Sequence, residues 1–460
     1  MLKTLCATAL LAAWFVMPAI AVAATDTELA EIREQIKQMK ETYEARIRAL
    51  EDRLKAAETA ASPAPLAPAT APAAGATSVP YSASTLAAFN PGISVVLQGT
   101  YARLSRDPSQ FAISGFQIGE EVGPGRRGLS LSESELSFLA NVDDKFYGNL
   151  TIALTPENEV EVEEAYGVLT ALPYGVVPKF GRFFSGIGYM NEQHQHVWDF
   201  KDAPLAYQAF LGNQFAQDGL QVKWVAPTDT FLEFGAEIGN GESFPGSQRD
   251  SNGIGAGSVF VHTGGDVGPR ASWRAGVSFL KTRASDRQGT QLDTTGNIVQ
   301  TAFAGNTKLT IADFVWKYAP TGNAKQTNFK VQGEYFWGRE RGELTYDSDG
   351  ALGLTQTDAY SSHQRGWYLQ GIWQFMPMWR AGVRYDRLNP GTPDYGVNIG
   401  FIATDPFDPR KTTVMLDYTP SEFSRFRLQY AQSKTRPDMS DNQLFLQYIL
   451  SLGAHPAHKF

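Results

Sequence analysis

The sequence VVPKFGRFFSGIGYMNEQHQHVWDFKDAPLAYQAFLGNQFAQDGLQVKWVAP, residues 176–227, begins and ends as a β-strand. Near its end Leu220, Val222 and Trp224 alternate with polar neighbours, the period of two of a strand with one wet face. Between the strands, residues 185–216 have no sustained period but are rich in aromatic side chains. Such a long connection is usually functional or disordered, and its aromatic content argues against disorder. We therefore expect an ordered loop in or over the mouth of a β-barrel.

The N-terminus has the pattern of a secretory signal peptide. Lys3 is followed by an apolar run, residues 5–20, and by small residues up to position 24. The run is shorter than the ~20 residues of a membrane-spanning helix. Cys6 is the only cysteine, so a mature chain would contain neither disulfides nor thiolate metal sites.

The charge of the chain argues against nucleic acid as a partner. There are 40 Lys and Arg against 48 Asp and Glu, a net charge of −8, and loss of Lys3 makes it more negative. No second apolar run reaches spanning length. Insertion into a membrane would therefore use β-strands, each needing about ten alternating residues.

The segment that follows the signal peptide is predicted to be a coiled coil. Residues 26–58 contain neither Gly nor Pro, and apolar residues recur at steps of three and four. A single amphipathic helix lying on the barrel is the alternative. Ala, Pro, Ser and Thr then dominate as an extended tether. The expected organisation is a signal peptide at 1–24, a coiled-coil helix at 25–59, a tether at 60–88 and a β-barrel at 89–460.

From Phe89 onward, sixteen short alternating runs are separated by clusters of Gly, Pro, Asn and Asp. The runs are 93–103, 129–141, 146–154, 160–171, 176–184, 219–226, 230–239, 255–263, 270–281, 308–318, 327–337, 364–375, 379–388, 412–418, 422–432 and 443–452. The fold class we expect is all-β, a sixteen-stranded transmembrane antiparallel barrel with an N-terminal periplasmic coiled-coil helix.

The connections between the runs alternate in length. Short turns such as 142–145, 227–229 and 376–378 alternate with long loops such as 104–128, 185–218, 282–307 and 338–363. This alternation is typical of bacterial outer-membrane barrels, and an even number of strands leaves both chain ends in the periplasm. A large soluble β-sandwich is the alternative, but it explains neither the paired lengths nor the aromatic residues near the run ends. These are Trp224, Trp316, Tyr318, Trp337, Trp373 and Tyr418.

The alternation also assigns charged residues to the water-filled interior. The expected interior bases are Lys223, Arg274, Lys330, Arg380, Arg384, Arg425 and Arg427, against the acids Glu233, Glu237, Glu334 and Asp386. This excess of bases favours the passage of anions. The alternative is a mixed-charge interior that simply stays hydrated.

Three stretches carry a family resemblance: FNPGISVVLQGTYA at 89–102, KFGRFFSGIGYMNEQHQHVWDF at 179–200 and DGLQVKWVAPT at 218–228. Together with the signal peptide, coiled coil and tether, they resemble outer-membrane porins of the phosphate-selective porin O/P type, in a branch labelled zinc-regulated or receptor-like. The resemblance implies a sixteen-stranded barrel, a trimer, and a third outer loop that constricts the pore. The loop at 185–218 follows the fifth run and would be that loop. It contains Lys201 but no lysine cluster, unlike the phosphate-specific members.

The loop contains the candidate site residues. His194, His196, Asp199, Lys201 and Asp202 are expected at the pore constriction. Because residues i and i+2 of an extended segment face the same side, His194 and His196 could hold one Zn²⁺ with Asp199 or Glu192, and zinc is the only cofactor the sequence suggests. A structural hydrogen-bonding pair is the alternative. A second pair, His455 and His458, lies in the tail.

These observations predict a non-enzymatic channel, because the chain has no G-x-S-x-G or comparable nucleophile motif. The expected function is passive diffusion of small hydrophilic solutes, with a preference for phosphate-like anions or a link to zinc. The expected partners are two further copies in a homotrimer, outer-membrane lipid, and peptidoglycan through the coiled coil. The alternatives are a structural anchor that tethers the cell wall and a TonB-dependent receptor, although the latter needs a large N-terminal plug.

Overall fold

A computed structural model describes residues 92–453 except 120, 405 and 438. The signal peptide, the coiled coil, the tether and the tail pair His455 and His458 lie outside the described residues. The strands are β1 (Gly92–Leu104), β2 (Gly128–Leu131), β3 (Ser134–Asn141), β4 (Phe146–Leu154), β5 (Val160–Leu169), β6 (Val176–Phe184), β7 (Ala216–Val225), β8 (Phe231–Gly239), β9 (Ala256–Val267), β10 (Ala271–Leu292), β11 (Ile298–Tyr318), β12 (Asn328–Tyr346), β13 (Gln356–Met376), β14 (Trp379–Asn389), β15 (Arg410–Ser421), β16 (Ser424–Arg436) and β17 (Met439–Gly453).

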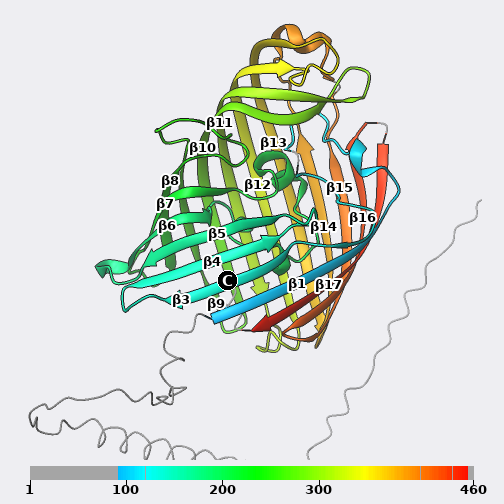
Figure 1. Cartoon of the computed structure of the whole chain (residues 1–460). Helices are drawn as coiled ribbons and strands as arrows, with labels where there is room; N and C mark the ends of the chain where they lie inside the picture. The colour runs from blue at the N-terminus through cyan, green and yellow to red at the C-terminus, as the bar shows by residue number, and fades with distance from the viewer. Residues whose placement is uncertain (1–91, 120, 405, 438, 454–460) are drawn as a thin grey trace, which may run out of the picture. The chain divides into compact units, whose positions relative to one another are not determined.

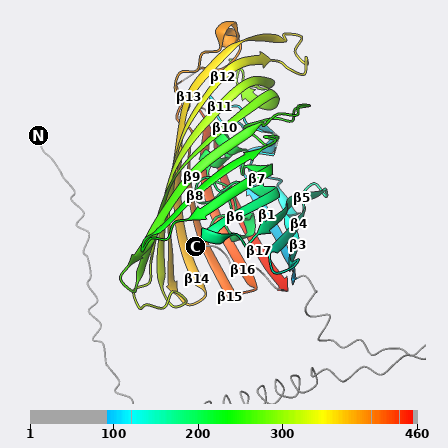
Figure 2. The same cartoon turned by 90° about the vertical axis from the view of Figure 1, so that its left-hand side faces the viewer.

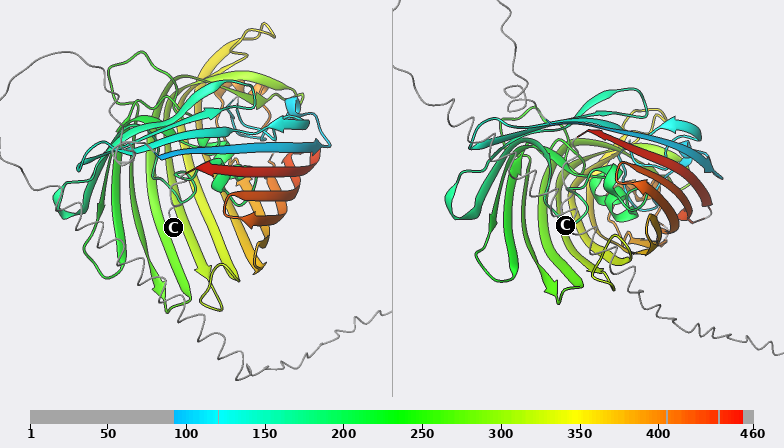
Figure 3. Two further views of the ribbon diagram at one scale, coloured as in Figure 1. Left: turned by 60° about the horizontal axis from the view of Figure 1, so that its bottom comes forward. Right: turned by 90° about the horizontal axis from the view of Figure 1, so that it is seen from below.

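The strands form one closed antiparallel ring (Figures 1 and 3). Each strand from β3 onward pairs with the next, and β1 closes the ring by pairing with both β17 and β3. β2 and β3 both pair with β1, so they share one position interrupted at residues 132 and 133. The ring therefore has sixteen positions, and the predicted sixteen-stranded antiparallel barrel is confirmed.

The two faces of the strands follow the alternation read from the sequence. On β10, Val277 and Phe279 are exposed on the outside, whereas Ser278 is buried on the inside. On β17, the outward Tyr448 is likewise exposed and the inward Gln447 is buried. The outer wall is thus apolar and the inner wall largely polar, as expected of a barrel with lipid outside and water inside.

Two of the long loops predicted from the sequence, 282–307 and 338–363, are largely strands in the structure. Residues 282–292 continue β10, and residues 298–307 continue β11, so the connection is a short turn at the tip of a long hairpin. β12 and β13 extend in the same way into the predicted loop 338–363. Both hairpins rise beyond the shorter strands β3 to β6 (Figure 2). The inward side chains of the two tips pack into a second hydrophobic cluster, which contains Phe303, Leu344 and Tyr360, and the backbone hydrogen bonds of the ladder continue to the tips.

The connection after β6 lies inside the ring and is called the inner loop, residues 185–215. It contains η3 (Gln195–Val197) and the helix α3 (Leu205–Leu211), all seven residues of which are buried. Figure 3 shows this green segment within the circle of strands. Gly212 ends α3 in the left-handed conformation, with φ of 60°. Among the described residues, no helix is long and apolar enough to cross a membrane.

Candidate functional site

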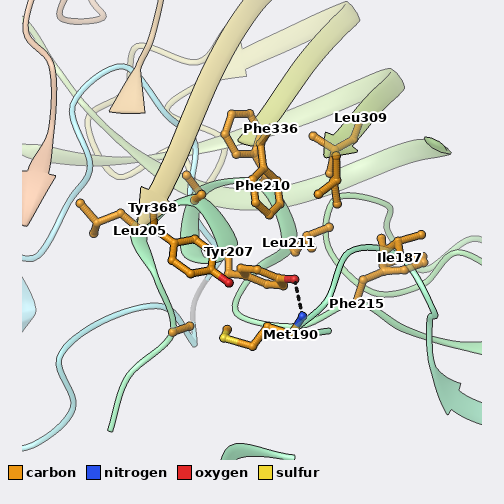
Figure 4. Close-up of a cluster of buried hydrophobic side chains, with 14 of the residues drawn as sticks. Ile187, Met190, Leu205, Tyr207, Phe210, Leu211, Phe215, Leu309, Phe336 and Tyr368 are labelled. Carbon is orange, nitrogen blue, oxygen red and sulfur yellow. Dashed lines mark hydrogen bonds between the residues drawn. The ribbon is translucent and has the colours of Figure 1, made fainter. Parts of the chain in front are cut away.

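One side of the inner loop is held by apolar packing against the wall of β10 to β14 (Figure 4). Phe210 of α3 stacks on Phe336 with ring centroids 5.8 Å apart and meets the edge of Phe116 at 5.6 Å. Two wall glycines make room for its ring, since a Cβ at Gly338 would lie 2.6 Å from Phe210 and one at Gly366 would lie 3.0 Å away. Burial of such side chains contributes about 1.5–3 kcal/mol each.

Two buried wall carboxylates bind the backbone of the loop. Glu334 accepts hydrogen bonds from the hydroxyls of Tyr207 at 3.0 Å and Tyr368 at 2.7 Å, and from the amides of Tyr189 and Met190. Glu237 accepts from the Ser185 hydroxyl and the Gly186 amide. Both acids face the interior as expected, but they bind the loop, which fixes its path across the barrel.

The two aspartates of the loop form ion pairs with wall bases. Asp199 pairs with Lys330 and, at 3.2 Å, with Arg380. Asp202 pairs with Lys411 at 2.6 Å and with Arg384 at 3.0 Å. Burial alone would raise the pKa of Asp199, but Lys330 and Arg380 lower it to about 2. Asp199 is therefore ionised at neutral pH and fastens the loop electrostatically.

Lys201, between these aspartates, sits in a different environment. Its backbone amide donates to Gln429 at 2.8 Å, and its Nζ lies 5.1 Å from the ring centre of Phe445. Burial lowers the pKa of its ammonium group, against the opposing effect of Asp202. All five residues expected at the constriction lie in the inner loop. Lys201 faces the wall aromatic Phe445, whereas Asp199 and Asp202 face wall bases.

Most bases of the inner wall are neutralised by nearby acids. Lys223 pairs with Glu192 at 2.7 Å. Arg274 pairs with Asp313, and Arg427 with Asp417 at 2.8 Å. The count of interior charges from the sequence omitted the acids Asp313 and Asp417 and also the base Lys411, and it could not show that most of the bases are paired.

The two histidines of the loop lie beside β3 and β5. His194 Nδ1 is 3.0 Å from Glu163 and 3.3 Å from Glu135, and its Nε2 is 3.1 Å from Glu164. His196 Nδ1 is 2.7 Å from the second oxygen of Glu135, and the two imidazole rings stack with centroids 5.7 Å apart. We call these five residues the histidine cluster.

The expected carboxylate neighbours of the histidines are wrong. Asp199 and Glu192 pair with wall bases instead, and the segment is not extended as assumed, because Gln195–Val197 form the 3-10 turn η3. Burial would lower the pKa of His194, but Glu163 and Glu135 raise it well above its usual value. The histidine cluster thus stabilises positive charge strongly.

A cavity of about 570 Å³ opens beside the loop, at the end of the barrel with the short turns. Tyr189 and Asp199 of the loop line it on one side. Its basic lining residues are Arg270, Lys317, Lys330, Arg380 and Arg425, against the acids Asp199 and Asp266. This part of the interior therefore carries an excess of positive charge, unlike the wall as a whole.

An uncharacterized protein of Aquifex aeolicus is 31% identical to this chain over 404 residues, which cover 81% of this chain and 80% of that protein. The chain belongs to the same family. No protein-family model matches it, and the resemblance to phosphate-selective porins stays a prediction.

Several solved outer-membrane barrels are similar to this chain in structure, at low sequence identity. The trimer form of OmpT from Vibrio cholerae is 13% identical with a TM-score of 0.47, covering 79% of this chain and 99% of its own. The channel DcaP of Acinetobacter baumannii is 12% identical with a TM-score of 0.46, covering 79% and 97%. An anion-selective porin from Comamonas acidovorans is 11% identical with a TM-score of 0.44, covering 79% and 99%.

The acidic partners of His194 and His196 were not predicted from the sequence. A β-bulge opposite Thr151 and Ile152 inserts Glu163 into β5, so Glu163 and Glu164 both turn inward although they are neighbours. The run VEVEEA at 160–165 contains the signal, since two consecutive acids in an alternating strand suggest a change of register. Glu135 carries no comparable signal.

Proposed function

We propose that this protein is an outer-membrane porin, a passive channel for small hydrophilic solutes, with the inner loop as its constriction. The observation that carries the proposal is the inner loop itself, fastened across the inside of a closed barrel beside a charged cavity. Apolar contacts hold it to β12, and the histidine cluster holds it near β4, which lies halfway round the ring. A loop held on both sides divides the interior, so the space left beside it would set the size and charge of the solutes that cross.

The outer wall supports placement in a membrane. Outward aromatic side chains, among them Trp224 and Trp373, gather near the short turns, and Trp337 lies on the outside of β12 where the apolar alternation ends. Such positions match the two interfaces of a bilayer. We infer that the short turns face the periplasm, that residues 1–24 direct export, and that the coiled coil at 25–59 and the tether at 60–88 precede the barrel in the periplasm.

We also propose a preference for anions, including phosphate-like ones. The excess of bases around the 570 Å³ cavity supports it, because charge at a narrow part of a pore outweighs charge elsewhere on the wall. The preference is expected despite the neutralised wall. Substitution of Asp199→Asn together with Asp202→Asn would release paired bases and shift the reversal potential further toward anions.

The second candidate is a closed anchor whose barrel holds a cell-wall tether. The dense packing of α3 favours it, since every residue of that helix is buried. The TonB-dependent receptor is not proposed, because such plugged transporters have about twenty-two strands.

Single-channel recording in planar bilayers separates porin from anchor. The purified full chain should give ohmic current steps, and in a KCl gradient the reversal potential should indicate anion preference. Deletion of residues 191–209 should raise the conductance markedly while the barrel still migrates faster unboiled than boiled on gels. A folded barrel without current steps would establish the anchor, and unchanged conductance after the deletion would remove the loop from the conducting path.

A further inference from the structure

The histidine cluster has the composition and spacing of a metal site. His194 Nδ1 and one carboxylate oxygen each from Glu135 and Glu163 all lie within 4.8 Å of one another. The two distances from Nδ1 to these oxygens are 3.3 and 3.0 Å. Donor atoms about 2.0–2.2 Å from a tetrahedral zinc ion are separated by roughly 3.4 Å, so small side-chain rotations would suffice.

The remaining members of the cluster occupy the positions of supporting partners. Metal-binding imidazoles usually donate their other N–H to a carboxylate, which fixes the ring. His194 Nε2 meets Glu164 at 3.1 Å, and the second oxygen of Glu135 meets His196 at 2.7 Å. The histidine cluster therefore contains both a donor set and its supporting partners.

The surroundings of the cluster favour a cation. Glu135 and Glu164 are buried, and Glu163 is 11% exposed in its side chain. His194 is less enclosed, with 21% of its side chain exposed, which provides a path of entry. One imidazole and two carboxylates suit a divalent transition metal, because Ca²⁺ and Mg²⁺ prefer ligand sets made of oxygen alone.

We propose that His194, Glu135 and Glu163 bind one divalent transition-metal cation such as Zn²⁺, with Glu164 and His196 as supporting partners. The three ligands come from the inner loop, β3 and β5, so the ion would clip the loop to the wall opposite its apolar contacts. It would thereby stiffen the part of the inner loop that lies nearest Glu135, Glu163 and Glu164.

The test is calorimetric titration of Zn²⁺ into the chelator-stripped full chain in detergent at pH 8, where binding competes less with protons. His455→Gln and His458→Gln are included throughout to remove binding by the tail. One ion per chain should bind. His194→Gln and Glu163→Gln should abolish this binding, and Glu164→Gln should weaken it by about 10–100-fold.

His363→Gln is the matched control, because His363 is exposed on the outer face of β13 and should not affect the stoichiometry. Equal binding in His194→Gln, or loss of binding in His363→Gln, would overturn the proposal. If His194→Gln fails to fold, the site is tested instead by adding Co²⁺ to the chain that carries only the two tail substitutions. Visible absorption bands of protein-bound Co²⁺ that Zn²⁺ removes are expected, and their absence would refute the site.

Discussion

Phe210→Ala should release helix α3 from the wall without unfolding the barrel. Phe210 is 6% exposed, and its ring stacks on Phe336 and fills the space above Gly338. Truncation of a buried Phe to Ala typically costs about 3–5 kcal/mol, since a cavity is left behind. The barrel keeps its closed hydrogen-bond ladder, so this cost should fall on the docking of the loop.

A loss of about 3 kcal/mol corresponds to a ~100-fold increase in the undocked population. Hydrogen–deuterium exchange of residues 205–211, followed by mass spectrometry, should therefore accelerate by about that factor where exchange requires undocking. Single-channel records should show added open-state noise. Gly338→Ala should act in the same direction, because its Cβ would meet the Phe210 ring at 2.6 Å.

Phe279→Ala is the matched control. It removes the same side chain from the outer face of β10, where Phe279 is 39% exposed, and should leave the exchange of residues 205–211 unchanged. Unaltered exchange in Phe210→Ala, or an equal change in Phe279→Ala, would refute the inference that α3 is held by this packing.

Three further predictions concern the membrane, acid and assembly. Val277→Arg should lower the free energy of unfolding by about 2–4 kcal/mol at the bilayer midplane, whereas Val267→Arg, also outward but beside a short turn, should cost about 0–1 kcal/mol; urea unfolding in lipid vesicles measures both, and equal costs would contradict the placement of the bilayer. Because the pKa of Asp199 is lowered to about 2, its contribution to loop docking is present above its unfolded pKa near 3.9 and is lost as the pH falls toward 2. Open-channel noise of the native chain should therefore be higher at pH 3 than at pH 5. The variant Asp199→Asn should be noisy at both pH values. Chemical crosslinking in mild detergent should give a trimer, and a persistent monomer would defeat that assembly.

The barrel could be predicted from the sequence, but the pairing of the charged residues on its inner wall could not. Alternation along a strand depends only on neighbouring residues, so Val277 and Ser278 identify their own faces. The pairing of Arg427 with Asp417, or of Asp199 with Lys330, depends on which strands are neighbours and on their register. No local pattern contains that information.

The sequence by itself determined the sixteen strands, their inner and outer faces, and the position of one long aromatic loop, because each follows from local periodicity or composition. Only the tertiary structure decided the length of the β10–β11 and β12–β13 hairpins, because the apolar side chains of one tip, such as Phe303, are buried against those of the other hairpin, such as Tyr360. It also decided the partners of His194 and His196, since Glu135, Glu163 and Glu164 reach them from other strands, two of them through a β-bulge. Contacts across the inside of a barrel join residues far apart in sequence, and closure of the ring brings them together.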